Sequence, residues 1–409
     1  MNRHSLTTVL ILTCLFLLVG KTHAWDDLPP IPDINNPYSQ FVCVGCPVQF
    51  DGSTSYDQDE AGESIEHWYW YYGDDGYWHD DGPTPTHTYN APGAYLVWLH
   101  VEDDEGTESL EDDCCIVYVV KVDKVVEAGT TNEGPLYVCP DDTVNLQAKP
   151  YPAGVPFPSG EPYWKIVSQP SGANAYLSPS SGSATTTLSS LGKPGEYVVK
   201  AKCGNNDTGH TITVKVVEVE SLLPNEGTEI DDGDNEPNTK LFVVCVVPPS
   251  PPSTLTVTAT PNPSVSEADL PACWTLTGGT GTGKLTRTVD KTTPGETVIT
   301  CTCNTSMKKT TIWVVRGEVS LASSWACDGQ QVNVDLILTP AGVENHITSV
   351  QWQATVPSGV TNYGSPSGQG LTFSQRSADI TEWRIDNARW YSNQADHCND
   401  GADWEIEAT

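Results

Sequence analysis

A short unit, in which a Pro-Gly pair precedes an alternating run of apolar and polar residues, recurs along the chain. In the copy at residues 193–203, one face carries Tyr197, Val199, Ala201 and Cys203, and the other carries Val198, Lys200 and Lys202. This alternation is typical of a half-buried antiparallel strand. The proline of this copy is Pro194, and further copies begin at Pro92 and Pro294. Successive prolines are therefore 102 and 100 residues apart. Strand units at this period predict an all-β chain made of β-sandwich domains in tandem.

The N-terminal residues have the pattern of a secretory signal. Arg3 supplies a basic start, an apolar run follows, and small residues end at Ala24, which predicts a cleaved signal peptide over residues 1–24. The apolar run is too short for a comfortable membrane span and no second long run follows, so we expect no transmembrane segment. The mature protein is therefore expected to be secreted and extracellular, or periplasmic.

The composition is strongly acidic, with 53 Asp and Glu residues against 20 Lys and Arg residues and a formal net charge of −33. Nucleic acid is an unsuitable partner for such a chain, because phosphate groups are bound mainly by Lys and Arg. The charge fits a well-solvated surface, and it also fits the binding of Ca²⁺ by carboxylates.

Five ordered motifs indicate the type of the first domain. They are VQFDGS at 48–53, SYDQD at 55–59, WYWYYGDDG at 68–76, HTY at 87–89 and PGAYLVWLHV at 92–101. With these motifs, residues 41–123 resemble the PKD domain, an immunoglobulin-like β-sandwich. The family usually has Trp-x-Phe-Gly-Asp-Gly, whereas here Tyr72 replaces the Phe and an additional Asp splits the turn. Such domains usually act as spacers or as glycan- and protein-contact modules, which is what the resemblance implies for this segment.

The rest of the chain is expected to contain three further immunoglobulin-like domains. Residues 124–220 contain Cys139, Trp164 and Cys203, which resemble the general immunoglobulin pattern of Cys, Trp and Cys. The first Cys and the core Trp are 25 residues apart in three of the units and 29 in the other. The expected segments after the signal peptide are a Pro-rich linker (25–40), the PKD-like domain (41–123), a second domain (124–220), an acidic linker (221–240), a third domain (241–317) and a divergent fourth domain (318–409).

Thirteen cysteines, less Cys14 in the signal peptide, leave twelve in the mature chain, and six disulfides are expected. The Cys-to-Trp spacing suggests that each bridge joins the two sheets of one domain. The expected pairs are Cys139–Cys203, Cys327–Cys398, Cys245–Cys303 and Cys273–Cys301, with Cys43 and Cys46 pairing to Cys114 and Cys115 in either combination. The pair Cys273–Cys301 conflicts with strand parity, because Cys273 neighbours core Trp274 and should point outward.

The strand alternation in the first domain predicts an exposed row of aromatic side chains. If Trp70 and Leu99 face the core, their neighbours along the two strands face solvent. The candidate ligand-binding residues are Tyr69, Tyr71, Trp78 and Trp98, with His100 and Tyr77 beside them. Exposed rings in a row suit stacking on sugars, and they also suit contacts with proteins. The alternative is that they pack under the second domain or under residues 25–40.

Two acidic loops of the first domain are candidates for Ca²⁺. One loop contains Asp57, Asp59, Glu60 and Glu63, and the other contains Asp103, Asp104 and Glu105. The candidate ligands are Asp57, Asp59, Asp103 and Asp104. Clustered oxygen ligands near the end of a domain are what Ca²⁺ requires. No cofactor is required by the predicted fold, so Ca²⁺ is the single candidate ion, and solvation alone is the alternative explanation for the acidic loops.

No catalytic motif is present that would indicate an enzyme. The Gly-rich run at residues 278–284 has the spacing of a phosphate loop, but Leu285 occupies the position of the Mg²⁺-binding hydroxyl and the run lies between strands. We therefore expect a non-catalytic binding or adhesion protein that contacts an extracellular glycan or protein through its first domain. A structural spacer or matrix component is the alternative, and an unrecognised hydrolase is a distant third.

Overall fold

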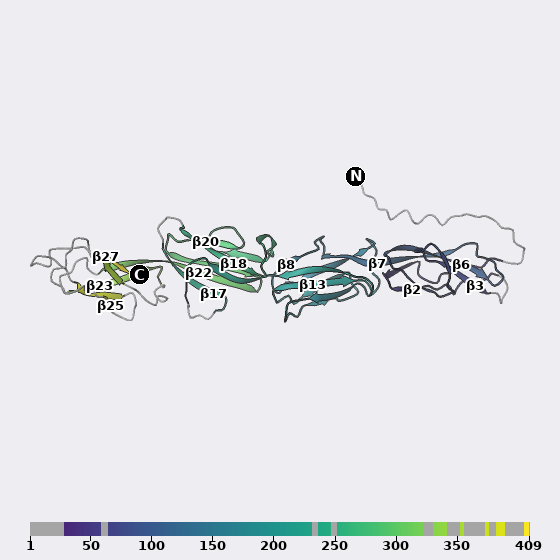
Figure 1. Ribbon diagram of the computed structural model, residues 1–409, viewed down its shortest axis with the longest axis horizontal. Coiled ribbons are helices and arrows are strands. Elements are labelled where there is room, and N and C mark those ends of the chain that lie inside the picture. Colours follow the sequence, from purple (N-terminus) through teal and green to yellow (C-terminus); the bar gives the residue numbers. More distant parts are fainter. Residues whose placement is uncertain are drawn as a thin grey trace, which may run out of the picture.

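The computed structural model describes residues 28–58, 64–230, 236–246, 252–321, 330–341, 352–355, 373–375, 382–388 and 405–408. Within these ranges the chain is all-β, with one short 3-10 helix at Glu267–Asp269, as the alternating pattern predicted. The described sandwiches follow one another in a row along the molecule (Figure 1). No described helix has the length and apolarity that crossing a membrane requires.

Each Pro-Gly unit places a glycine at the first position of a long strand. The three strands are β6 (Gly93–Asp103), β13 (Gly195–Lys202) and β21 (Gly295–Cys303). In β13, Tyr197, Val199 and Ala201 are fully buried, whereas the residues between them are partly exposed. The period-two pattern therefore corresponds to one face on a core and one face toward solvent.

The first domain packs a two-stranded sheet against one end of a large sheet. The large sheet runs in the order β4, β3, β6, β7, with β1 parallel to β7, and β2 pairs with β5. Its core is aromatic, with Phe50, Trp70, Tyr72 and Tyr89 all buried. The strand bounds are β1 Ser39–Cys43, β2 Pro47–Gln49, β3 Ile65–Tyr71, β4 Trp78–Asp80, β5 Thr86–Thr88 and β7 Asp113–Glu127.

Much of the stretch expected as a Pro-rich linker, residues 25–40, is instead part of the first domain. Ile34 is buried in the core, and its N–H donates to Asp113 Oδ2 at 2.7 Å. Ile31 forms an isolated bridge with Tyr56. Pro30 and Ile34 of this segment are buried, which composition alone does not show.

The second and third domains share one feature with the first, in which a strand near the start of the domain pairs in parallel with its last strand. In the second domain β8 pairs with β14, and in the third β17 pairs with β22. The bounds are β8 Leu136–Val138, β9 Val144–Tyr151, β10 Tyr163–Ser168, β11 Tyr176–Ser178, β12 Thr185–Ser189, β14 His210–Val216, β15 Glu218–Pro224, β16 Thr228–Ile230, β17 Thr239–Cys245, β18 Thr254–Asn262, β19 Trp274–Thr277, β20 Thr286–Asp290 and β22 Ser306–Leu321.

The described strands beyond the third domain form two further small sheets. β23 (Gln330–Thr339) pairs with the end of β22 and with β26 (Glu382–Ala388), which in turn pairs with β25 (Phe373–Gln375). β24 (Trp352–Thr355) pairs with β27 (Glu405–Ala408). The expected disulfide Cys327–Cys398 lies outside the described residues.

Strands, rather than linkers, connect the domains. β7 is 15 residues long and pairs with β6 of the first domain and with β9 of the second. The end of β22 likewise extends beyond the third domain, where it pairs with β23. Only Val217 separates β14 of the second domain from β15 of the third. The expected acidic linker at 221–240 therefore contains the end of β15, all of β16 and the start of β17. Glu229 in this segment lies at an exposed position of β16 and forms an ion pair with Lys240 at 2.8 Å.

The disulfides join successive domains, so the predicted pairing Cys139–Cys203 is wrong. Cys43 at the end of β1 bonds to Cys203 at the end of β13, and Cys139 bonds in the third domain. Cys139 follows β8 at the end of the second domain that faces the third, whereas Cys203 lies at the opposite end. Two cysteines at opposite ends of a sandwich cannot reach the Cα separation of a disulfide.

The remaining pairings expected in the first and third domains are also wrong. Cys43 does not meet Cys114 or Cys115, because it turns toward the next domain, where it joins the second hydrophobic core. In the third domain, Cys273 and Cys303 both approach Cys139 and neither approaches the predicted partner. Among the described residues, Cys46, Cys115, Cys245 and Cys301 carry no disulfide.

Candidate functional site

The solvent face of the large sheet in the first domain carries a row of aromatic side chains across three neighbouring strands. Tyr71 on β3 lies opposite Trp78 on β4 and opposite Trp98 on β6. The adjacent row on the same face consists of Asp80, Tyr69 and His100. The structure thus brings all four predicted ligand-binding residues together. The group of Tyr69, Tyr71, Trp78, Trp98 and His100 is named the aromatic face below.

The buried neighbours of these residues set their direction. Trp70 and Leu99 lie opposite each other and are fully buried, so the residues on either side of them point to solvent. The turn from β3 to β4 contains Gly73 and Gly76, both with a φ of 83° that favours glycine. A Cβ at Gly73 would lie 2.8 Å from the backbone oxygen of Leu96, so only glycine fits this turn without a shift.

The rings of the aromatic face contact one another and remain accessible. The centroids of Tyr71 and Trp78 are 5.7 Å apart, those of Trp78 and His100 are 6.1 Å apart, and those of Tyr69 and His100 are 6.3 Å apart. Trp78 is 47% exposed, and the other rings are partly exposed. Neighbouring rings restrict each other's rotamers, so the face is held in one arrangement before a ligand arrives.

A second aromatic pair extends this face and was missed by sequence reasoning. Phe41 on β1 stacks on Tyr118 of β7, with centroids 5.3 Å apart. Tyr118 lies opposite Ala94, which is on the same side of β6 as Trp98. The alternation of buried Val117 with Tyr118 could have placed Tyr118 outward, but the parallel pairing that brings Phe41 beside it has no sequence signal.

Carboxylates lie beside the aromatic face and interact with a polar atom of Tyr69 and of His100. The Tyr69 hydroxyl donates to Glu102 Oε2 at 2.9 Å, and this hydrogen bond raises the pKa of Tyr69 to about 12. His100 Nδ1 lies 2.8 Å from Asp112 Oδ1, and that interaction raises the pKa of His100. The site therefore offers flat rings for stacking and carboxylate oxygens that accept hydrogen bonds from hydroxyl or cationic groups.

The two acidic loops meet at one end of the first domain. Carboxylate oxygens of Asp57, Asp104 and Glu105 all lie within 4.8 Å of one another. Asp103 is buried, and one of its carboxylate oxygens holds the backbone of its own loop. Its Oδ1 accepts hydrogen bonds from the N–H groups of Glu105 at 3.0 Å and Thr107 at 2.8 Å. Its Oδ2 is buried and accepts no hydrogen bond in the described structure. The predicted Asp59 lies outside the described residues.

The family comparison agrees with the motifs of the first domain. A family model described as PKD domain matches residues 28–116, which is about a fifth of the chain. The first domain is a PKD domain. The match begins before β1, in agreement with the packing of Ile34 in the core of the PKD domain. No curated protein sequence matches the chain.

Solved structures similar to this chain are built from several domains in tandem. They include three N-terminal domains of the outer capsid protein Hoc of bacteriophage RB49, with 12% identity, 70% of this chain and 99% of that chain covered, and a TM-score of 0.33. An I-band fragment of titin has 13% identity, 70% and 98% coverage and a TM-score of 0.27. The human desmocollin-1 ectodomain has 11% identity, 93% and 78% coverage and a TM-score of 0.23. Scores this low carry no information about function.

The segment before β1 does not cover the aromatic face of the PKD domain in the described structure. Its contacts go to other parts of the domain: Asn35 binds the backbone and side chain of Asp51, Ile31 pairs with Tyr56, and Ile34 binds Asp113. The second domain adjoins the PKD domain through the continuation of β7. The packing alternative for the aromatic residues therefore has no support among the described contacts.

We expect Ca²⁺ to bind the acidic loops of the PKD domain and to raise its thermal stability. A ligand at one hundred times its dissociation constant stabilises a folded protein by about 2.7 kcal/mol. The Asp57→Asn/Asp104→Asn protein should lose this stabilisation, while the Glu66→Gln protein, altered at an exposed carboxylate of the same domain, should keep it. Isothermal titration that gives no heat with Ca²⁺ at millimolar concentration would exclude the site.

Proposed function

We propose that the protein is an exported, non-catalytic binding protein that contacts glycans or proteins through the aromatic face of its PKD domain. The observation that carries the proposal is the row of Trp78, Tyr71 and Trp98 on three adjacent strands. Neighbouring strands are about 4.8 Å apart, so the row presents ring surface over roughly 10 Å. Such a flat, accessible strip suits stacking on consecutive sugar rings or on the flat parts of a peptide.

The charges beside the rings narrow the choice of ligand. Asp80, Glu102 and Asp112 lie on the flanking positions, and the chain as a whole has a formal charge of −33. Acidic polysaccharides would be repelled, whereas neutral polysaccharides can donate hydroxyl hydrogen bonds to these carboxylates. We therefore expect neutral glycans to bind in preference to acidic ones.

The test is a pull-down of the mature protein on insoluble neutral polysaccharides. The Tyr71→Ala/Trp98→Ala protein should bind about 5- to 150-fold more weakly, because two stacked rings together contribute roughly 1–3 kcal/mol. The matched control is Tyr163→Ala/Tyr176→Ala, which removes two exposed rings from the second domain and should bind like the wild type. Unchanged thermal unfolding of the first variant is needed to assign its loss of binding to the face. Hydrolysis of the bound polysaccharide would contradict the non-catalytic part of the proposal.

A structural spacer is the second candidate, and the domain junctions favour it. β7 and β22 run through two junctions without a linker, and disulfides tie the first domain to the second and the second to the third. Failure to bind any polysaccharide, combined with reduced stability of the Tyr71→Ala/Trp98→Ala protein, would support the spacer and count against the binding face.

A further inference from the structure

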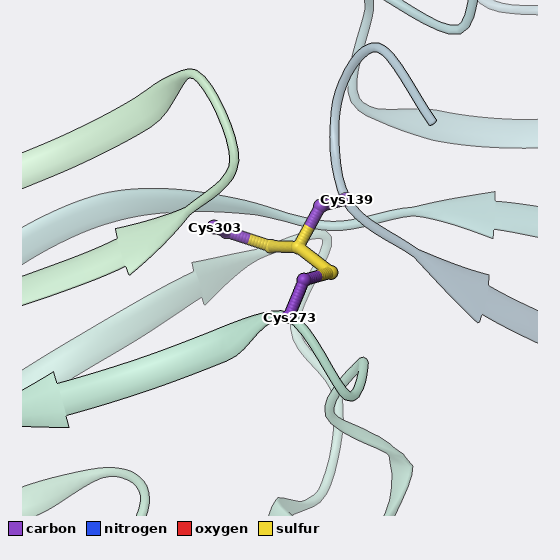
Figure 2. Close-up of side chains that lie close together, drawn as sticks. All are labelled: Cys139, Cys273 and Cys303. Atoms are coloured by element: carbon purple, nitrogen blue, oxygen red, sulfur yellow. A yellow bond between two sulfur atoms is a disulfide. The ribbon is translucent and has the colours of Figure 1, made fainter. Parts of the chain in front are cut away.

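Three cysteines meet where the second domain joins the third (Figure 2). The Cα atom of Cys139 is 5.3 Å from that of Cys303 and 6.4 Å from that of Cys273. Both separations lie within the range of disulfides in proteins. One sulfur forms one disulfide, so whichever bond Cys139 makes, the other cysteine of the third domain is left as a thiol.

Each of the two possible thiols has a hydrogen-bond acceptor in place. The Cys273 Sγ lies 3.6 Å from Asp142 Oδ2, and the Cys303 Sγ lies 3.1 Å from the carbonyl oxygen of Val217. Asp142 is itself fixed, because its Oδ2 accepts the N–H of Cys139 at 2.9 Å. Neither arrangement of the bond therefore leaves a thiol without a polar partner.

The two thiols differ in their access to solvent. Cys139 and Cys303 are fully buried, whereas Cys273 is partly exposed. A cavity of about 500 Å³ lies at the same junction, and its walls include Val138 and Ala272, which directly precede Cys139 and Cys273. The bond Cys139–Cys303 thus leaves the accessible thiol free, and the bond Cys139–Cys273 leaves the buried one free.

The first junction also has an additional cysteine near its interdomain disulfide. Cys43 and Cys203 form the disulfide between the domains, and Cys46 lies in the turn after Cys43, where its N–H donates to the Cys43 carbonyl at 3.0 Å. A Cβ at Gly204 would lie 2.7 Å from Cys46 Sγ and 3.7 Å from Cys43 Sγ. A third cysteine therefore stands beside the interdomain disulfide at both junctions.

We propose that Cys139, Cys273 and Cys303 form a thiol–disulfide exchange site at the junction of the second and third domains. The Cys273 thiol loses its proton to water, and its thiolate attacks Cys139 Sγ. The Cys273–Cys139 bond forms while the Cys139–Cys303 bond breaks, and Cys303 leaves as a thiolate that takes a proton from water. One disulfide and one thiol are present before and after the step, so no external oxidant or reductant is needed.

The exchange keeps the two domains covalently joined in both states, because Cys273 and Cys303 belong to the same domain. What changes is the reactivity of the junction. With Cys139 bonded to Cys303, the partly exposed Cys273 thiol is open to alkylating agents and to small disulfides. With Cys139 bonded to Cys273, the remaining thiol is buried and protected.

Disulfide mapping of the mature protein, never exposed to reductant, tests the proposal. Thiols are blocked with N-ethylmaleimide at mildly acidic pH, and the protein is then digested with pepsin, so that no exchange follows sampling. We expect peptides that link Cys139 to Cys303 and peptides that link Cys139 to Cys273 in the same wild-type sample. The maleimide label at this junction should be found on Cys273 in preference to Cys303.

Two matched variants complete the experiment. The Cys273→Ser protein should contain only the Cys139–Cys303 link, and the Cys303→Ser protein should contain only the Cys139–Cys273 link with its thermal unfolding nearly unchanged. A single Cys139 linkage in the wild type, or a free Cys139 thiol in the Cys303→Ser protein, overturns the proposal. Stoichiometric zinc or copper bound to three reduced cysteines would overturn it as well, since thiolates at this spacing also suit those metals.

Discussion

Replacing Trp70 with alanine should lower the free energy of unfolding of the PKD domain by about 4 kcal/mol. Trp70 is fully buried, and its ring packs against Phe50 at a centroid distance of 5.4 Å. Its Nε1 donates to the Gly82 carbonyl at 2.9 Å, so the substitution also leaves an acceptor without its donor. Scanning calorimetry of the mature protein should show the corresponding transition lowered by more than about 10 °C.

Trp78→Ala is the matched control, because it removes the same side chain from the exposed face of the same sheet. Trp78 is 47% exposed, and its loss should cost less than about 1 kcal/mol. An equal loss of stability in the two proteins would mean that the aromatic face is covered in the native molecule. That outcome would count against a ligand-binding role for the face and would favour packing between domains.

The Cys43→Ser/Cys203→Ser protein is expected to be less stable than the wild type by about 4 kcal/mol. The disulfide that it lacks closes a loop with a sequence separation of 160, and this cross-link restricts the unfolded chain. The junction keeps weaker contacts, among them the hydrogen bond of Asn206 Nδ2 to the Gly45 carbonyl at 3.0 Å. Urea denaturation of the mature protein under non-reducing conditions measures the difference.

The single substitutions distinguish the roles of the three cysteines at this junction. Cys46→Ser should leave the stability unchanged, because the Cys43–Cys203 bond remains. Cys43→Ser alone should cost about as much as the double substitution, because either change removes the Cys43–Cys203 bond. If Cys46→Ser destabilises the protein as strongly as the double substitution, the assigned Cys43–Cys203 bond is incorrect.

Local patterns were sufficient to predict the strands and the direction of their side chains. The buried pair of Trp70 and Leu99 follows from alternation alone, and it places Tyr71 and Trp98 together on the outer face. These predictions depend only on the period of a strand and on the adjacency of two strands in an immunoglobulin-like sandwich. Binding by this face is a separate matter, which the pull-down decides.

The disulfide partners could not be obtained in the same way. The spacing of 25 residues from the first Cys to the core Trp recurs in three of the units and indicates equivalent positions in those domains, but it does not show which end of the sandwich the cysteines occupy. Cys139 and Cys203 terminate strands that reach opposite ends, and each therefore meets a cysteine of a different neighbouring domain. Contacts between domains depend on how the domains are stacked, which has no local pattern in the sequence.

The acidic loops show a second limit to what can be predicted from the sequence. Composition placed Asp103 and Asp104 together as candidate ligands, yet adjacent residues of a strand end point in opposite directions. Asp103 turns inward to hold the backbone of its own turn, and Glu105 joins Asp104 and Asp57 instead. The residue type was informative, whereas the choice among neighbouring carboxylates required the backbone geometry.

The two interdomain disulfides also limit how far the molecule can be stretched. The loops that they close overlap, because Cys139 lies between Cys43 and Cys203, and Cys203 lies between Cys139 and Cys303. Tension applied from Cys43 to Cys303 therefore passes through the two bonds and the intervening chain from Cys139 to Cys203. That path has about 60 residues and a maximum length of ~200 Å, whereas the reduced chain would extend over roughly 260 residues to ~900 Å. Even if the second domain unfolded under load, the oxidised molecule would lengthen by only a small part of what its sequence allows, and reduction would convert it into an extensible tether.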